Sequence, residues 1–293
     1  MRRFISAIAF AAMLVVVLGA AGCGQRFDRD AAANAPAPAD LAADALSALE
    51  DAGSAHFVAD VRSKSPGGAL GGPALALHFE GDASRNALDA EGSISFGFGT
   101  LSGRILVGDH DLFIQFMDEW YGEHRGIVDA VAEAREEQDG KLWNELATPD
   151  GLRRNFGLLF AGEVSEGAPI DGVATWRFEG RINPEGIITL AERFGEPTPP
   201  DEAEMIRKAA PGSKFVLVVG QEDHLPRRLE LSVHASSEDL GKTQASGYAD
   251  IVSGEDFTST LVLSDFGKRV EIDPPADFKP LDELFSQLFS GFE

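Results

Sequence analysis

Cysteine is nearly absent from this sequence, since Cys23 is the only thiol among 293 residues. Without a second cysteine the chain cannot form an internal disulfide, so its stability must come from a buried core. Basic residues are also scarce, with 25 Lys and Arg against 48 Asp and Glu and a net charge of −23. A chain this acidic repels phosphate backbones, so we expect no nucleic-acid partner.

The sequence also lacks the short motifs that mark common enzymes. It has no G-x-S-x-G, S-x-x-K or H-E-x-x-H pattern and no phosphate-binding G-x-x-x-x-G-K-[ST] loop. Asp109-His110-Asp111 groups metal-ligand side chains, but without a second clustered histidine it is typical of a polar turn. We therefore expect a protein that is not an enzyme and that needs no metal or cofactor.

The first 22 residues have the three parts of a secretory signal peptide. Arg2 and Arg3 are followed by an apolar run from Phe4 to Leu18, and then by small residues up to Gly22. A basic start, an apolar stretch and a small-residue cleavage site predict that residues 1–22 are removed. The alternative is an uncleaved membrane helix, because about 18 apolar residues nearly span a bilayer.

The cleavage region, Leu18-Gly19-Ala20-Ala21-Gly22-Cys23, resembles a bacterial lipobox. The resemblance implies that Cys23 becomes the acylated first residue of the mature chain, which ties the protein to a membrane. Loss of Arg2 and Arg3 leaves 23 basic and 48 acidic residues, a mature charge of −25. Residues 23–38 are predicted to be the acylated cysteine and a flexible Ala- and Pro-rich tether that spans about 20 Å.

Residues 39–293 are predicted to form one large domain that opens with a helix and continues with strands. Asp40 is the expected N-cap of this helix, and Gly53 is expected to end it. The apolar period then changes from 3.6 to 2, and the links carry Gly, Asp, Asn and Ser. This alternation predicts antiparallel strands with one polar face, at residues 57–61, 75–80, 94–98, 101–107 and 112–116.

The middle of the domain is predicted to be helical, and strands resume after it. Helices are expected at 127–138, from Thr148 or Asp150 to 160, at 184–194 and at 201–210, with one strand at 173–182. Further strands are expected at 215–219, 229–233, 244–252, 258–266 and 270–272. The amphipathic tail, 281–292, is expected to dock on the core, and the alternative is a helix that contacts a partner or a membrane.

This order of elements predicts an α+β fold. A single large antiparallel sheet, curved into a half-barrel, would wrap helices gathered on its concave face. The run Ser95-Phe96-Gly97-Phe98-Gly99 supports the curvature, because glycine inside a strand often marks a bend. Trp120 and Tyr121 are expected to close one edge of the core, and the alternative is that they line the mouth of a lipid site.

Several short stretches resemble the LppX/LprG family of actinobacterial lipoproteins, which are relatives in fold of the LolA/LolB carriers. The resemblance implies a half-barrel whose apolar cavity holds the acyl chains of lipids or glycolipids. The chain departs from the family in the acidic helix at 127–138 and in the Phe-rich tail after Pro280. The resemblance therefore does not identify which lipid this chain would bind. The matching stretches are Ala45-Leu46-Ser47-Ala48-Leu49, Ala55-His56-Phe57-Val58, Phe79-Glu80-Gly81-Asp82, Gly108-Asp109-His110-Asp111-Leu112-Phe113-Ile114, Trp120-Tyr121, Thr148-Pro149-Asp150-Gly151-Leu152, Ile170-Asp171-Gly172-Val173, Leu261-Val262-Leu263-Ser264-Asp265-Phe266-Gly267-Lys268 and Ile272-Asp273-Pro274-Pro275.

These observations together predict a carrier of lipid or glycolipid, anchored through Cys23 on the outer face of the cytoplasmic membrane. The alternative is a non-enzymatic sensor or assembly module that uses the half-barrel as a protein-docking platform. An envelope protein is a further candidate partner of this chain. Acyl chains would be driven into the cavity by burial of apolar surface. The residues predicted to face them are Phe57, Leu77, Phe79, Ile94, Phe96, Ile105, Val107, Ile114, Leu217 and Leu231.

Overall fold

The computed structural model describes residues 35–64, 75–96, 99–108, 111–124, 145–193, 198–234 and 256–289. Several predictions fall on other residues and lie outside this range. They concern the signal peptide, Cys23 and the tether as far as residue 34, Asp109-His110, the helix at 127–138 and the strand at 244–252.

Twelve strands form one sheet that does not close on itself, in the order β12-β6-β5-β4-β3-β2-β1-β11-β10-β9-β8-β7. All neighbours pair antiparallel except β12 and β6, which pair parallel. The fold is therefore α+β with a single large, mostly antiparallel open sheet, as predicted. The strands are β1 (Ser54–Lys64), β2 (Leu75–Ser84), β3 (Leu88–Phe96), β4 (Gly99–Val107), β5 (Asp111–Phe116), β6 (Glu119–His124), β7 (Phe160–Ile170), β8 (Val173–Ile182), β9 (Ser213–Gly220), β10 (Pro226–His234), β11 (Asp256–Ser264) and β12 (Lys279–Pro280).

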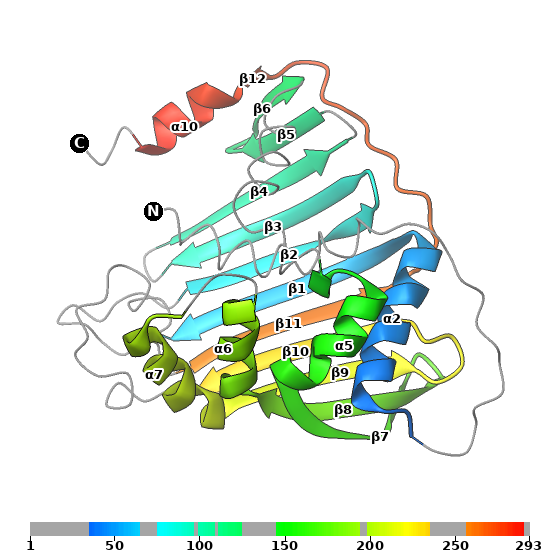
Figure 1. Cartoon of the computed structure of the whole chain (residues 1–293). Helices are drawn as coiled ribbons and strands as arrows, with labels where there is room; N and C mark the ends of the chain where they lie inside the picture. The colour runs from blue at the N-terminus through cyan, green and yellow to red at the C-terminus, as the bar shows by residue number, and fades with distance from the viewer. Residues whose placement is uncertain are drawn as a thin grey trace.

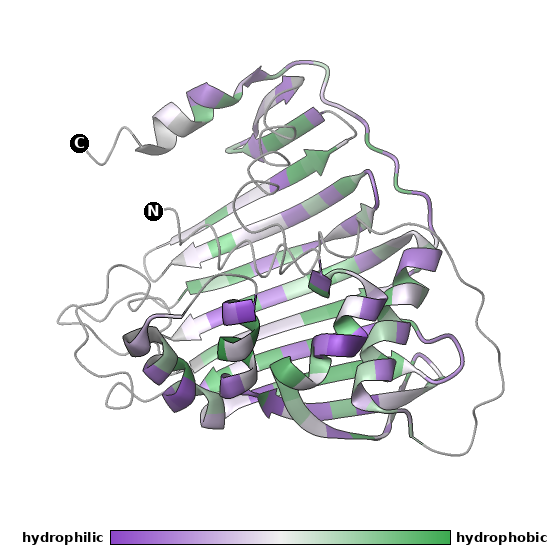
Figure 2. Cartoon of the chain, in the orientation of Figure 1, coloured by the Kyte–Doolittle hydropathy of each residue, from purple (hydrophilic) through white to green (hydrophobic). Residues whose placement is uncertain are grey.

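The helices gather on one face of the sheet, which is called the inner face below (Figure 1). Most of them lie over the half that contains β1 and β7–β11, whereas α10 lies at the opposite end beside β6 (Figure 1). Apolar and polar residues alternate along most strands (Figure 2), as one covered and one solvated face require. The helical elements are α2 (Pro38–Ala52), α5 (Pro149–Leu159), α6 (Pro184–Arg193), α7 (Pro200–Ala209), the short 3₁₀ turn η1 (Ala210–Gly212) and α10 (Leu281–Phe289).

Local sequence signals set most helix ends. Gly53 ends α2 in the left-handed conformation at φ 74°, as predicted. The Thr148 hydroxyl accepts a hydrogen bond from the Gly151 amide at 3.0 Å and caps α5, and Asn183 plays the same part for α6. The prediction that Asp40 caps α2 was wrong, because proline occupies the first helical position and places Ala37 at the N-cap.

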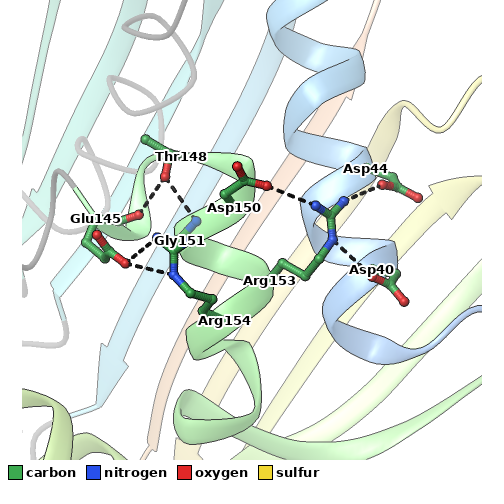
Figure 3. Close-up of polar contacts among 8 residues, drawn as sticks. All are labelled: Asp40, Asp44, Glu145, Thr148, Asp150, Gly151, Arg153 and Arg154. Carbon is green, nitrogen blue, oxygen red and sulfur yellow. Dashed lines mark hydrogen bonds and ion pairs between the residues drawn. The ribbon is translucent and has the colours of Figure 1, made fainter. Parts of the chain in front are cut away.

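One arginine and three aspartates form a cluster of ion pairs that joins α2 to α5 beside the sheet (Figure 3). The guanidinium of Arg153 on α5 contacts Asp40 at 3.0 Å and Asp44 at 3.1 Å on α2, and also Asp150 on its own helix at 3.1 Å. Asp40 therefore fixes helix packing rather than the helix end. Because the Arg153 side chain is 38% exposed, solvent screens these pairs, and they orient the helices more than they stabilise them.

The strand prediction failed in four places. The strand expected at 94–98 belongs to a longer strand that ends earlier, because β3 runs from Leu88 to Phe96 and Phe96 pairs with Gly99 of β4. Residues 119–124 form β6, where no strand was predicted. Residues 160–170 form β7, although the sequence had suggested that the preceding helix runs to Phe160. Residues 270–272 form no strand, and the last strand is the two-residue β12, which pairs with Tyr121 and Gly122.

The turn between β5 and β6 explains why β6 was missed. Met117 and Asp118 both have positive φ, 51° and 64°, which is the conformation of a type I′ hairpin turn. Such turns normally carry Asn-Gly, and neither residue is present here.

Met117→Asn is expected to raise the free energy of unfolding. The gain should be about 0.5–1 kcal/mol, part of the roughly 1–2 kcal/mol that a left-handed conformation costs an ordinary L-residue. Little packing is lost, because Met117 is 72% exposed. Chemical denaturation measures the change, and Met117→Ala, which keeps the strain, should show no comparable gain. Equal stability of both variants and the wild type would contradict this account of the turn.

Candidate functional site

The strand register places all ten residues of the predicted site on the inner face. Leu77 lies opposite Ile94, and Ile105 lies opposite Ile114. Residues that are directly opposite in an antiparallel pair project to the same side of a sheet. When the pairs are followed from strand to strand, the residues between Ile114 on β5 and Leu217 on β9 are found on the same side of the sheet. Phe96 shares the register, but its side chain lies outside the described part of the structure.

Helix α2 covers one half of this face, and four of the ten residues lie in that half. Phe57 and Leu217 are each 4% exposed. Leu217 belongs to a cluster with α2 and α5, against which Leu231 packs, and Phe57 belongs to a second cluster that includes Phe79. These four side chains therefore form the packed core of the domain.

Helix α10 covers the other end of the inner face. Leu281 and Leu284 pack on Tyr121 in a third cluster, to which Ile114 contributes. The Lys279 ammonium lies 2.6 Å from a Glu119 carboxylate oxygen, and the Tyr121 hydroxyl donates to the other Glu119 oxygen at 2.8 Å.

The contacts around Glu119 fix the start of α10 on β6. The hydrogen bond from Lys279, followed by the one from Tyr121, lowers the pKa of the Glu119 carboxyl below its ordinary value. The same contact with Glu119 raises the pKa of Lys279. Both groups therefore stay charged at neutral pH. The start of α10, at Leu281 and Leu284, docks on the core, as predicted for the tail.

Between these two covered ends lies a band of apolar side chains on β2, β3 and β4. They belong to none of the three packed clusters among the described residues. Leu77 is 6% exposed, Leu101 is 37% exposed, and the other three are half-buried. We call this band the inner strip, and it consists of Leu77, Ile94, Leu101, Ile105 and Val107.

Two glycines lie side by side within the inner strip. Gly92 on β3 and Gly103 on β4 lie directly opposite each other on the inner face. A methyl group at Gly92 would come within 2.3 Å of the Phe79 ring, so this ring lies over the glycine. The Phe79 ring therefore occupies the space above Gly92 that a side chain at this position would take.

Four of the ten predicted residues therefore lie in the inner strip, and sequence reasoning missed one member of it. Leu101 has the same two-residue spacing as Ile105 and Val107, which could have found it. Trp120 and Tyr121, considered as a pair, lie on opposite faces, because Trp120 pairs with Gln115 whereas Tyr121 pairs with Ile114. Only Tyr121 closes the core.

The inner strip can bury hydrocarbon but has no group for acid–base chemistry, because all five of its side chains are aliphatic. Across the described ranges, no group of three His, Cys, Asp or Glu side chains is placed to hold a metal ion. No helix in these ranges is long and apolar enough to cross a bilayer.

The chain matches no protein-family model, and a search of curated proteins found no match. Among solved structures it is similar to the lipoprotein LppX of Mycobacterium tuberculosis, with 18% identity and a TM-score of 0.40 over 81% of this chain and 100% of LppX. It is also similar to LprF of Mycobacterium bovis, with 16% identity and a TM-score of 0.40 over 83% of this chain and 100% of LprF.

Proposed function

We propose that this protein is a membrane-anchored lipoprotein that binds and carries a lipid or glycolipid, with acyl chains lying along the inner strip. The observation that carries the proposal is the strip itself. It is a group of aliphatic side chains on the inner face, outside the packed clusters of the described residues and between two helix-covered ends. The sequence resemblance to the LppX/LprG family supports the same function independently.

The physical driving force for binding is the removal of hydrocarbon from water. Each buried methylene contributes about 0.8 kcal/mol, so ten methylenes contribute about 8 kcal/mol before the costs of association. Such binding needs no charge and no catalytic group, which matches the aliphatic composition of the strip. It also leaves the headgroup unspecified, so the chemistry of the strip selects acyl chains rather than one particular lipid.

The anchor would be Cys23, acylated after removal of residues 1–22, on the outer face of the cytoplasmic membrane. We expect the N-terminal peptide of the protein isolated from membranes to begin at Cys23 and to carry acyl chains. Mass spectrometry of that peptide checks this. A peptide that begins at Met1, or an unmodified Cys23, would contradict the proposal that Cys23 anchors the protein. The proposal for the lipid-binding site would be unaffected.

Organic extraction of the purified full chain tests the binding function. Acyl chains attached to Cys23 are covalent and stay with the protein, so lipid in the extract comes only from non-covalent binding. We expect a defined lipid or glycolipid class at a roughly one-to-one molar ratio after detergent exchange. An extract without lipid, together with an unchanged thermal midpoint when lipid is added back, would favour a protein-docking module instead.

A further inference from the structure

A polar hollow of about 860 Å³ lies at the end of the sheet that contains β7, β8 and the start of β9. Its charged side chains come from positions that alternate with the inner-face residues, such as Glu179 next to Phe178 and Lys214 next to Phe215. They therefore lie on the outer face of the sheet, opposite the side that carries the inner strip. Pro211 and Gly212 of η1 complete the rim.

The lining of the hollow is richer in basic groups than the chain as a whole. Arg177, Arg181 and Lys214 face only two acids, Glu163 and Glu179, although the whole chain has almost twice as many acidic as basic residues. Charged residues on a sheet surface usually pair with an opposite charge across the strands. With three basic and two acidic residues, the lining of the hollow has one excess positive charge.

Two of the three cations converge on one carboxylate. Glu179 accepts from Lys214 at 2.8 Å through one oxygen and from Arg177 at 2.8 Å through the other. These hydrogen bonds, with Lys214 first, lower the pKa of Glu179, so the carboxylate stays ionised at neutral pH. The pairing holds both cations at the wall of the hollow and balances only one of their charges.

Arg181 is the third cation, and the residues directly opposite it on the adjacent strands supply no counter-charge. On β7 it lies opposite Ala161, whose methyl group leaves space beside the guanidinium. On β9 the residue next in register is Lys214, because Gly180 pairs with Phe215. Arg181 is exposed and makes no ion pair within the part of the chain that the structure describes.

We propose that this hollow binds an anion of the phosphate class, with Arg181 as its principal ligand and Lys214 and Arg177 as supporting cations. A guanidinium presents a planar fork of donors that matches phosphate oxygens in a two-point contact. The excess charge and the space beside Ala161 supply the two things that such a ligand needs. Because the hollow and the inner strip lie on opposite faces, this site is separate from the proposed lipid site and stands without it.

Calorimetric titration of the full chain with inorganic phosphate tests the site at constant ionic strength, with chloride as the reference anion. Arg181→Ala should weaken phosphate binding about tenfold, the ratio expected for one lost charge-assisted contact. The matched control is Arg269→Ala, which removes one positive charge from an 86% exposed side chain outside the hollow. The control should keep the wild-type affinity, and both variants should keep the thermal midpoint.

A second titration with glycerophosphoglycerol, a deacylated lipid headgroup, distinguishes the source of the phosphate. Tighter binding of this diester points to a lipid headgroup, and tighter binding of inorganic phosphate points to a free phosphate or monoester. Either result supports the site if it depends on Arg181. Wild-type protein that binds neither compound, or equal losses in Arg181→Ala and Arg269→Ala, would overturn the proposal.

Discussion

Phe178→Ala is expected to lower the free energy of unfolding by about 3–5 kcal/mol, the usual cost of deleting a buried ring. Phe178 is 0% exposed and lies where β8 meets the helices. Its ring packs edge-on against Phe156 of α5, with centroids 5.1 Å apart, and lies 6.0 Å from Phe215 of β9. Phe215 stacks in turn on Phe160 at 4.1 Å, so one ring supports contacts among three strands and a helix.

Urea denaturation measures this loss, and Phe178→Leu is the matched control. Leucine keeps an apolar side chain that fills more of the buried space than alanine does, so its cost should be clearly smaller than that of alanine. If alanine costs no more than leucine, the aromatic cluster is not the centre of the core, and the packing assigned to α5 is incorrect.

Ile105→Trp is expected to reduce bound lipid several-fold while the fold remains stable. Ile105 is half-buried in the middle of the inner strip, opposite Ala90 and next to the Gly92–Gly103 pair. If acyl chains lie along the inner strip, the indole occupies the volume that they need. In a tightly packed core the same substitution would cost about 1–3 kcal/mol through overpacking. An acyl-binding strip and a tightly packed core therefore predict opposite results for this one variant.

The lipid-to-protein ratio and the denaturation midpoint are to be measured on the same preparation. Val262→Trp is the matched control, because Val262 is 36% exposed and lies on the outer face of β11. It adds the same indole on the other side of the sheet and should leave bound lipid unchanged. A destabilised Ile105→Trp variant with its lipid intact would argue for a packed interior at this position.

Much of the fold could be predicted because alternation along a strand directly encodes which face is buried. The period-2 runs around Leu77, Ile105 and Leu217 gave the correct inner face even though their strands lie far apart in the sheet. The helix ends at Gly53 and Thr148 could be predicted for a similar reason, because each of these cap residues satisfies a local backbone requirement.

Edge elements were harder to predict because their signals are weak. Strand β7 forms one edge of the sheet and carries Gly162, Gly167 and Pro169, residues that are depleted in strand interiors but suit an edge. Strand β12 is only two residues long and exists because α10 docks beside it. Neither the parallel pairing of β12 nor the turn at Met117 leaves a usable pattern in the sequence.

The candidate site was predictable in its chemistry but not in its extent. Alternation identifies side chains that face inward, but it does not tell which of them a helix covers. Phe57 and Ile105 follow the same pattern, yet Phe57 lies in a packed cluster with Leu49 of α2, whereas Ile105 lies in the inner strip. The basic hollow could not be predicted from the sequence for a related reason, since Arg181 and Lys214 come together only through the β8–β9 register.

Photo-crosslinking tests the central claim most directly. The full chain is loaded with a fatty acid that carries a diazirine on its acyl chain, irradiated and digested, and the labelled residues are identified by mass spectrometry. Binding along the inner strip predicts adducts on the inner face of β2, β3 and β4, at Ile94, Ile105 and Val107, and competition by unlabelled lipid. Adducts confined to outer-face residues, or labelling that unlabelled lipid does not reduce, would contradict the proposed site.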